Sequence, residues 1–151
     1  MLRRARITKA GLEKNPAAEW NGFIELLACT AWEELGTSQR PAALVFWYES
    51  EVQNGGHLQY FMNGHVDRGD ETVQAPTQLG ADAQAIVLGR ALQRWRAVAR
   101  LLAADALEYA AIAGEPEFDD LDREFHACQV TLIDALYRHL ASHKERFVVR
   151  E

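Results

Sequence analysis

Pairs of histidines and acids in this chain have spacings at which a metal could be bound. His139 and His143 are four residues apart, a spacing that can place two imidazoles on one Zn²⁺. No glutamate follows His139 in the metalloprotease pattern, and no third ligand is close in the sequence. His57 and His65 precede an oxygen-rich run at 67–71, but this run lacks the alternating acids and closing glutamate of a calcium loop. We therefore expect no metal and no cofactor.

Enzyme chemistry has little support in the residue pattern. The chain has no nucleophile elbow, no phosphate-binding glycine loop and no CxxC pair. Glu49 and Glu51 are two residues apart, so on a helix they point in different directions and make a poor acid–base pair. Glu51, His57 and Gln59 remain as the candidate site of a small-molecule or metal-dependent enzyme. The pattern favours a protein that is not an enzyme, and an enzyme with these three residues in its site stays open as the alternative.

The run from Tyr48 to Gly64 predicts two central helices that meet at a glycine elbow. The first helix begins near Pro41 and stops at Asn54-Gly55-Gly56, because Asn and Gly tolerate the left-handed conformation that ends helices. A short second helix fits at 57–62 before Asn63-Gly64 stops it in the same way. Four polar residues lie near the aromatic residues of this corner, and each needs a hydrogen-bond partner if it is buried. The corner is either structural or the lining of a pocket.

The same run resembles the signature of the DNA mimic protein 19-like family, a bacterial family of helical domains. The matching positions are Glu51, Asn54, Gly55, Gly56, Gln59, Tyr60, Phe61 and Asn63. The family usually has an aromatic residue where this chain has His57, so the chain departs from the pattern there. The resemblance implies an all-α fold over about residues 20–143. It also implies a homodimer and an acidic surface that imitates duplex DNA and occupies a transcription factor.

Eight carboxylates within 20 residues form the second feature of the sequence, opposed only by Arg123. They are Asp105, Glu108, Glu115, Glu117, Asp119, Asp120, Asp122 and Glu124. Acids at a helix N-terminus complement the helix dipole, which accounts for those at 119–122 but not for those before them. We expect all eight to form the partner-binding surface.

The net charge of the chain is −6, and the charge is unevenly distributed. The first 14 residues carry five basic groups and one acid, so the rest of the chain is more acidic than the whole. An acidic body argues against direct binding to nucleic acid, which requires a basic face. It is compatible with a basic protein partner.

Length and composition fit one domain with a single core, since the chain has 151 residues of which 48% are hydrophobic. We expect a basic N-terminal segment at 1–14 and a single all-α domain at 15–151. No apolar run reaches the ~18–20 residues of a membrane span, and no apolar signal segment follows the basic N-terminus. Two cysteines do not make a disulfide framework. These features predict a cytoplasmic protein that does not bind membranes.

The periodicity of apolar residues predicts a compact multi-helix bundle. Outside the elbow, helices are expected at 15–36, 81–104, 105–113 and 120–143. The stretch 65–79 is expected to be a loop with one short helix around Glu71, and the tail at 147–149 to be extended.

Together these features predict a protein-binding regulatory domain of all-α fold. The sharper hypothesis is a DNA-mimic-like inhibitor that offers carboxylates to a basic DNA-binding protein such as a transcription factor. An enzyme with its site at the elbow is one alternative, and an immunity-type protein that blocks a toxin is another.

Overall fold

The computed structural model describes residues 2–65, 67–102 and 118–151, and most of this part of the chain is helical. The elements are β1 Ala5–Ile7, α1 Lys9–Lys14, α2 Ala18–Cys29, the 3₁₀ turn η1 Trp32–Glu34, α3 Arg40–Met62, α4 Gly69–Gln78, α5 Asp82–Leu102, α7 Asp119–Ala127, α8 Leu132–Ser142, α9 Lys144–Phe147 and β2 Val148–Arg150. The predicted all-α class is confirmed. Among the described helices, none is long and apolar enough to cross a membrane.

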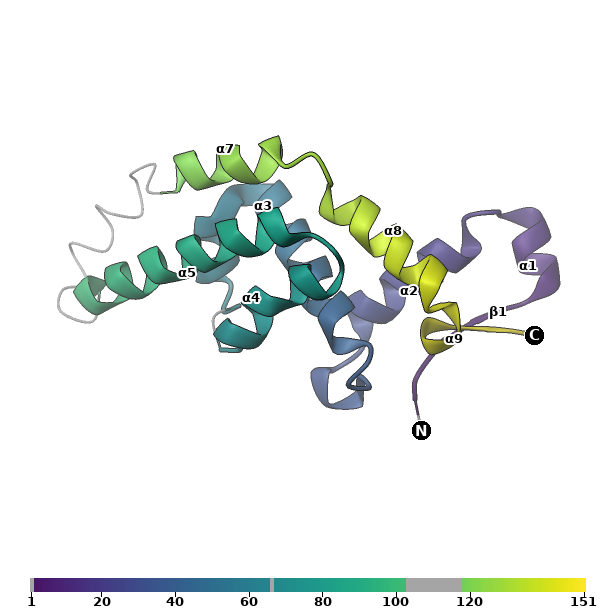
Figure 1. The fold of residues 1–151 in the computed structure, drawn as a ribbon. Coiled ribbons are helices and arrows are strands. Elements are labelled where there is room, and N and C mark those ends of the chain that lie inside the picture. Colours follow the sequence, from purple (N-terminus) through teal and green to yellow (C-terminus); the bar gives the residue numbers. More distant parts are fainter. Residues whose placement is uncertain (1, 66, 103–117) are drawn as a thin grey trace.

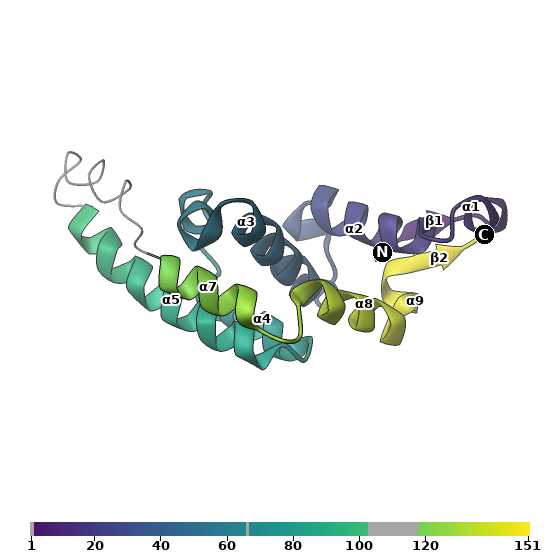
Figure 2. The same ribbon diagram turned by 90° about the horizontal axis from the view of Figure 1, so that it is seen from above.

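Helix α3 is the centre of the arrangement, since it packs against α2, α4, α7 and α8. Figures 1 and 2 show α5 and α7 toward one end of the molecule and the strands toward the other, with α3 and α4 in the middle. Helix α5 lies against both α4 and α7. The elbow in α3 is therefore surrounded by helices from later parts of the sequence.

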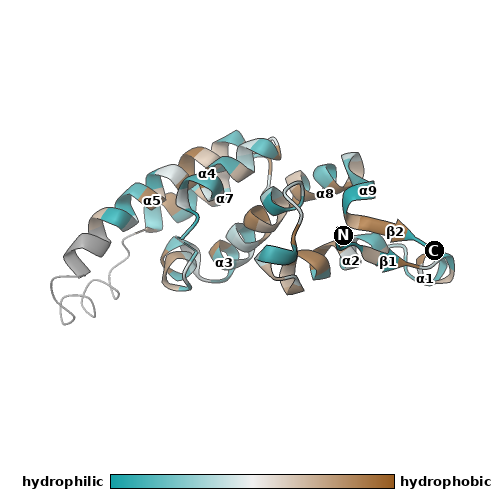
Figure 3. Ribbon diagram, turned by 90° about the horizontal axis from the view of Figure 1, so that it is seen from below, coloured by the Kyte–Doolittle hydropathy of each residue, from teal (hydrophilic) through white to brown (hydrophobic). Residues whose placement is uncertain are grey.

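The two ends of the chain meet in a small parallel sheet, in which β1 pairs with β2 and Arg6 lies opposite Val149. The predicted extended tail is thus confirmed at Val148 and Val149, whereas Phe147 is the last residue of helix α9. Strand β2 is hydrophobic over most of its length (Figure 3). The basic N-terminal segment is joined to the body by ion pairs from Arg3 to Glu34 and from Arg6 to Glu151. A domain boundary after residue 14 stays a prediction.

Aromatic and leucine side chains from both halves of the sequence fill the core. Phe23 packs edge-on against Phe147, with 4.9 Å between ring centroids, which joins α2 to the C-terminal end of the chain. Tyr48 packs against Phe125 at 5.3 Å, which joins α3 to α7. All of these side chains are buried. The apolar stripes predicted for the helices therefore face one continuous interior.

The single helix expected at 120–143 is wrong, because the chain forms α7 and α8 with a break between them. Cys128 adopts extended backbone angles (φ −61°, ψ 126°), which end α7. Thr131 then starts α8, and its hydroxyl accepts a hydrogen bond from the backbone N–H of Asp134 at 3.1 Å. A threonine that caps a new helix is a local signal, but the unbroken apolar period across the break hides it.

Two other expected boundaries also differ from the structure. The helix expected at 15–36 is shorter, because the Asn15 side chain holds a turn before α2 and Thr30 is extended after it. The stretch 65–79 contains a ten-residue helix, α4, which includes Pro76 and buries Thr72 and Ala75. Burial of its apolar face against α5 outweighs the weak helix propensity of this segment. The helix expected at 105–113 lies outside the described residues.

Gln39, just before α3, connects three separate parts of the backbone. Its side-chain amide donates to the carbonyls of Arg3 at 2.7 Å and Arg146 at 2.8 Å. Its carbonyl oxygen accepts from the backbone N–H of Gly36 at 3.0 Å. The Gln39 side chain has no exposed surface. If it were removed, water could not readily supply hydrogen bonds to these three backbone groups.

Replacement of Gln39 by Ala is expected to lower the free energy of unfolding by about 1–3 kcal/mol for each backbone group left unpaired. Urea unfolding followed by far-UV circular dichroism measures this loss. Gln129→Ala is the control, because Gln129 is exposed. Equal stability of the two variants would contradict the role assigned to Gln39.

Candidate functional site

The predicted elbow is present in α3 at Gly55 and Gly56. Gly55 has φ −153° and ψ 18°, and Gly56 has φ 75° and ψ −176°, so neither residue is helical. The backbone angles of Gly56 lie in a region that residues other than glycine rarely adopt. A Cβ atom on Gly56 would also collide with the carboxylate of Asp122. Glycine is therefore required here for both its backbone angle and its lack of a side chain.

Asp122 of α7 fixes the start of the second half of α3. One of its oxygens accepts from the backbone N–H of His57 at 2.9 Å and contacts Nδ1 of the same residue at 2.6 Å. The other ring nitrogen of His57, Nε2, lies 2.8 Å from the hydroxyl of Tyr48. The chain Tyr48–His57–Asp122 thus ties both halves of α3 to α7.

The donors and acceptors in this chain follow from the carboxylate at its end. Because the Asp122 carboxylate only accepts, Nδ1 of His57 carries a proton and donates it. In the neutral ring Nε2 is then an acceptor for the hydroxyl of Tyr48. Burial lowers the pKa of His57, and the hydrogen bond and charge of Asp122 oppose this only in part. Burial raises the pKa of Tyr48 well above its usual value, so its hydroxyl stays protonated.

A second polar cluster spans the elbow on the side of Glu51. One carboxylate oxygen of Glu51 accepts from the amides of Gln59 and Asn63, each at 2.8 Å. The other oxygen lies 3.4 Å from Nε2 of His65. Burial acts to raise the pKa of Glu51, but the three hydrogen bonds lower it, and the net direction is downward. Mutual bonding supports a structural role for these residues, while Asn54 is exposed.

The remaining motif residues, Tyr60 and Phe61, are buried in the core. Tyr60 lies 5.2 Å from Tyr48 between ring centroids, and Phe61 stacks on Trp95 of α5 at 5.4 Å. The signature therefore specifies the elbow in α3. Its glycines form the turn, its polar residues form hydrogen bonds across the turn, and its aromatic residues pack into the core on either side.

The acids expected to bind a partner have different environments. Asp105, Glu108, Glu115 and Glu117 lie outside the described residues. Asp120 makes two hydrogen bonds with Arg94, at 2.6 and 2.9 Å, and these hold the pKa of its carboxyl well below the usual range. Glu124 pairs with Arg90 at 2.5 Å, and Asp122 bonds His57. Asp119 is exposed.

The sequence alone does not distinguish Asp122 from the acids next to it. Asp122 and His57 are 65 residues apart, and no local pattern links them. The one available signal was His57 itself, which interrupts the family pattern with a group that needs hydrogen-bond partners when it is buried.

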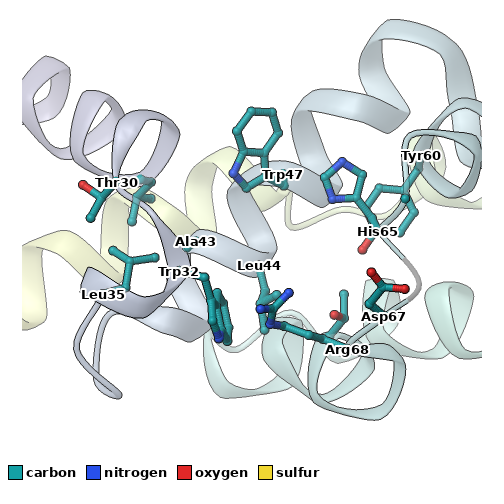
Figure 4. Close-up of a pocket in the computed structure, with 13 residues that line it drawn as sticks. Thr30, Trp32, Leu35, Ala43, Leu44, Trp47, Tyr60, His65, Asp67 and Arg68 are labelled. Carbon is teal, nitrogen blue, oxygen red and sulfur yellow. The ribbon is translucent and has the colours of Figure 1, made fainter.

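A pocket of about 210 Å³ lies beside the Glu51 cluster, between α2, η1, α3 and the start of α4 (Figure 4). Trp32 and Trp47 lie on its walls, and His65, Asp67 and Arg68 lie at one side. The His65 ring stacks on Tyr60 with 4.9 Å between centroids and an interplanar angle of 4°. The motif thus supports one wall of the pocket through Tyr60 and, by way of His65, through Glu51.

The histidine pair considered for zinc is brought together by α8. The rings of His139 and His143 lie 4.6 Å apart between centroids. Burial lowers the pKa of His139 to about 4, with further contributions from His143 and Arg146. Within the described residues, no three His, Cys, Asp or Glu side chains gather in a way that could hold a metal ion.

A family model described as DMP19-like protein matches residues 33–143, a range that includes the elbow, the Glu51 cluster and Asp122. The chain belongs to the DMP19-like protein family. Comparison with the curated proteins and with the solved structures gave no match.

Replacement of Asp122 by Ala is expected to lower the free energy of unfolding by about 1–3 kcal/mol, because the backbone N–H of His57 loses its acceptor. Gly56→Ala is expected to cost about 1–3 kcal/mol through its backbone angles alone, because only glycine readily adopts a positive φ with an extended ψ, and more through the collision with Asp122. Chemical denaturation measures both values. Asp119→Ala, one turn away and exposed, is the control, and a loss of the same size there would contradict the assignment.

The buried, neutral His57 makes stability depend on pH. Its pKa is lowered in the folded state from an unfolded value of about 6.5, so the unfolded chain binds more protons between these two values. Stability is therefore expected to rise with pH in this window and to fall as the pH drops below about 6.5. His139 acts in the same direction.

His57→Phe should reduce the slope of unfolding free energy against pH between about 7 and 5, while the contribution of His139 remains. Urea titrations at a series of pH values measure this slope. An unchanged slope would show that His57 is not held neutral in the folded protein.

Proposed function

We propose that this chain is a protein-binding regulatory domain that offers exposed carboxylates to a basic, DNA-binding partner. Membership of the DMP19-like family supports this proposal. Within it, the chain would act as an inhibitor by occupying the surface that its partner uses to hold the phosphates of DNA.

The distribution of ion pairs carries the proposal. Many basic side chains of the described residues are bonded to acids of the same chain. The pairs include Arg3–Glu34, Arg6–Glu151, Arg90–Glu124, Arg94–Asp120 and Lys144–Glu19. Internal pairs cancel charges of both signs, so they leave the net charge of −6 on the surface. A surface of this kind steers a basic partner toward it and repels nucleic acid.

Not all of the eight carboxylates can serve a partner equally. Asp122 is committed to His57, and Asp120 is committed to Arg94 by two hydrogen bonds. We therefore assign partner binding first to Asp119 and to the four acids at 105–117.

The enzyme alternative has less support from the geometry. His57 has no exposed surface and both of its ring nitrogens have hydrogen-bond partners. Glu51 is bonded to Gln59 and Asn63. A substrate would have to displace these bonds to reach either group, and each buried group left unpaired costs about 1–3 kcal/mol.

Capture from a lysate of the source cells tests the proposal. The immobilised protein is expected to capture a DNA-binding protein at low salt and to release it at high salt, since raising ionic strength from 0.1 to 1 M shortens the screening length from about 10 Å to about 3 Å. The captured protein should also lose its binding to duplex DNA in the presence of this chain.

The matched variants distinguish a specific surface from net charge alone. Glu115→Gln, Glu117→Gln and Asp119→Asn together should abolish capture. Glu13→Gln, Glu25→Gln and Asp134→Asn remove the same charge from other exposed positions and should retain it. Capture that is indifferent to salt and to the first variant, or a captured partner that still binds DNA, would contradict the proposal.

A further inference from the structure

The pocket between α2, α3 and α4 has an apolar interior and aromatic walls. Leucine and alanine side chains line its interior, and Trp32 and Trp47 face it from different elements (Figure 4). Trp47 is 37% exposed, so part of its ring is accessible from solvent. An interior of this kind favours a planar or bulky apolar group over water.

One side of the pocket carries two opposite charges that are adjacent in the sequence. Asp67 is exposed, and the Arg68 side chain extends from the same side toward Trp32 (Figure 4). The guanidinium carbon of Arg68 lies 4.1 Å from the centroid of the Trp32 ring. Within the described part of the chain, neither Asp67 nor Arg68 forms a salt bridge. Both therefore have hydrogen-bonding capacity for a ligand.

The wall next to these charges is held in place by the family motif. His65 bonds Glu51 at 3.4 Å and stacks between Tyr60 at 4.9 Å and Trp47 at 5.7 Å. The Glu51 cluster is fixed in turn by Gln59 and Asn63 across the elbow. A site whose walls are ordered before binding loses less entropy when a ligand enters.

We propose that this pocket binds a free α-amino acid with a large apolar side chain. The carboxylate would meet Arg68 and the ammonium would meet Asp67. The side chain would pack against Trp47 and the leucine side chains of the interior, because the guanidinium groups of Arg68 and Arg40 already lie over the Trp32 ring. A ligand with both charges can form a charge-assisted hydrogen bond at each of the two residues, whereas a ligand with one charge can form only one. The volume of about 210 Å³ lies below the range of about 300–1,000 Å³ for drug-sized ligands, which suits a single amino acid. This inference does not depend on the proposed partner.

Titration calorimetry with L-phenylalanine and two analogues tests the proposal. 3-Phenylpropanoate has the same ring and carboxylate but no ammonium, and phenethylamine has the ring and ammonium but no carboxylate. L-Phenylalanine is expected to bind at least tenfold more tightly than either analogue. No binding of L-phenylalanine at millimolar concentration, or equal binding of an analogue, would overturn the proposal.

Two variants assign each charge to its role. Asp67→Asn should weaken L-phenylalanine at least tenfold and leave 3-phenylpropanoate unchanged. Arg68→Gln should weaken L-phenylalanine by a similar factor and leave phenethylamine unchanged. Asp134→Asn, an exposed acid on α8, is the control and should leave all three unchanged. Thermal unfolding of each variant shows that the pocket is still folded, and equal loss of all three ligands in a folded variant would overturn the assignment.

Discussion

The carboxylate of Asp122 is the group on which the corner of this fold depends. At Gly55 and Gly56 the backbone leaves the helical path, so the N–H of His57 has no helical acceptor. Asp122 supplies one from α7, and the same oxygen orients the His57 ring toward Tyr48. Gly56 makes room for the Asp122 carboxylate, because a side chain there would collide with it. Gly56, His57 and Asp122 therefore depend on one another. The turn leaves the His57 N–H without a helical acceptor, Asp122 supplies that acceptor, and glycine at position 56 leaves space for the carboxylate.

The same contacts also determine which acids of α7 face solvent. Asp122 faces inward, although its neighbours in the sequence are acids, and it positions α7 so that Asp120 and Glu124 reach arginines of α5. On the other side of α3 the Glu51 cluster supports His65 and the wall of the aromatic pocket. The signature therefore fixes the position of α7 on one side of α3 and one wall of the pocket on the other.

Much of this arrangement could be predicted from the sequence, because it depends on local rules. The all-α class follows from apolar periodicity, and the elbow follows from Asn54-Gly55-Gly56. The bond between Asp122 and His57 could not be predicted, because it joins residues 65 positions apart and has no periodic signal. The break between α7 and α8 was hidden because the apolar residues keep their period across it. The pocket depends on Trp32, Trp47 and Arg68 meeting from three separate elements, which only the tertiary fold determines.

The most direct test of this account is the tautomer of His57 in the folded protein, measured by two-bond ¹H–¹⁵N correlation NMR at neutral pH. The account predicts a neutral ring with the proton on Nδ1, donated to Asp122, and an unprotonated Nε2 that accepts from Tyr48. A proton on Nε2, or an imidazolium at neutral pH, would contradict the account, because Nε2 could not then accept the hydrogen bond from the Tyr48 hydroxyl.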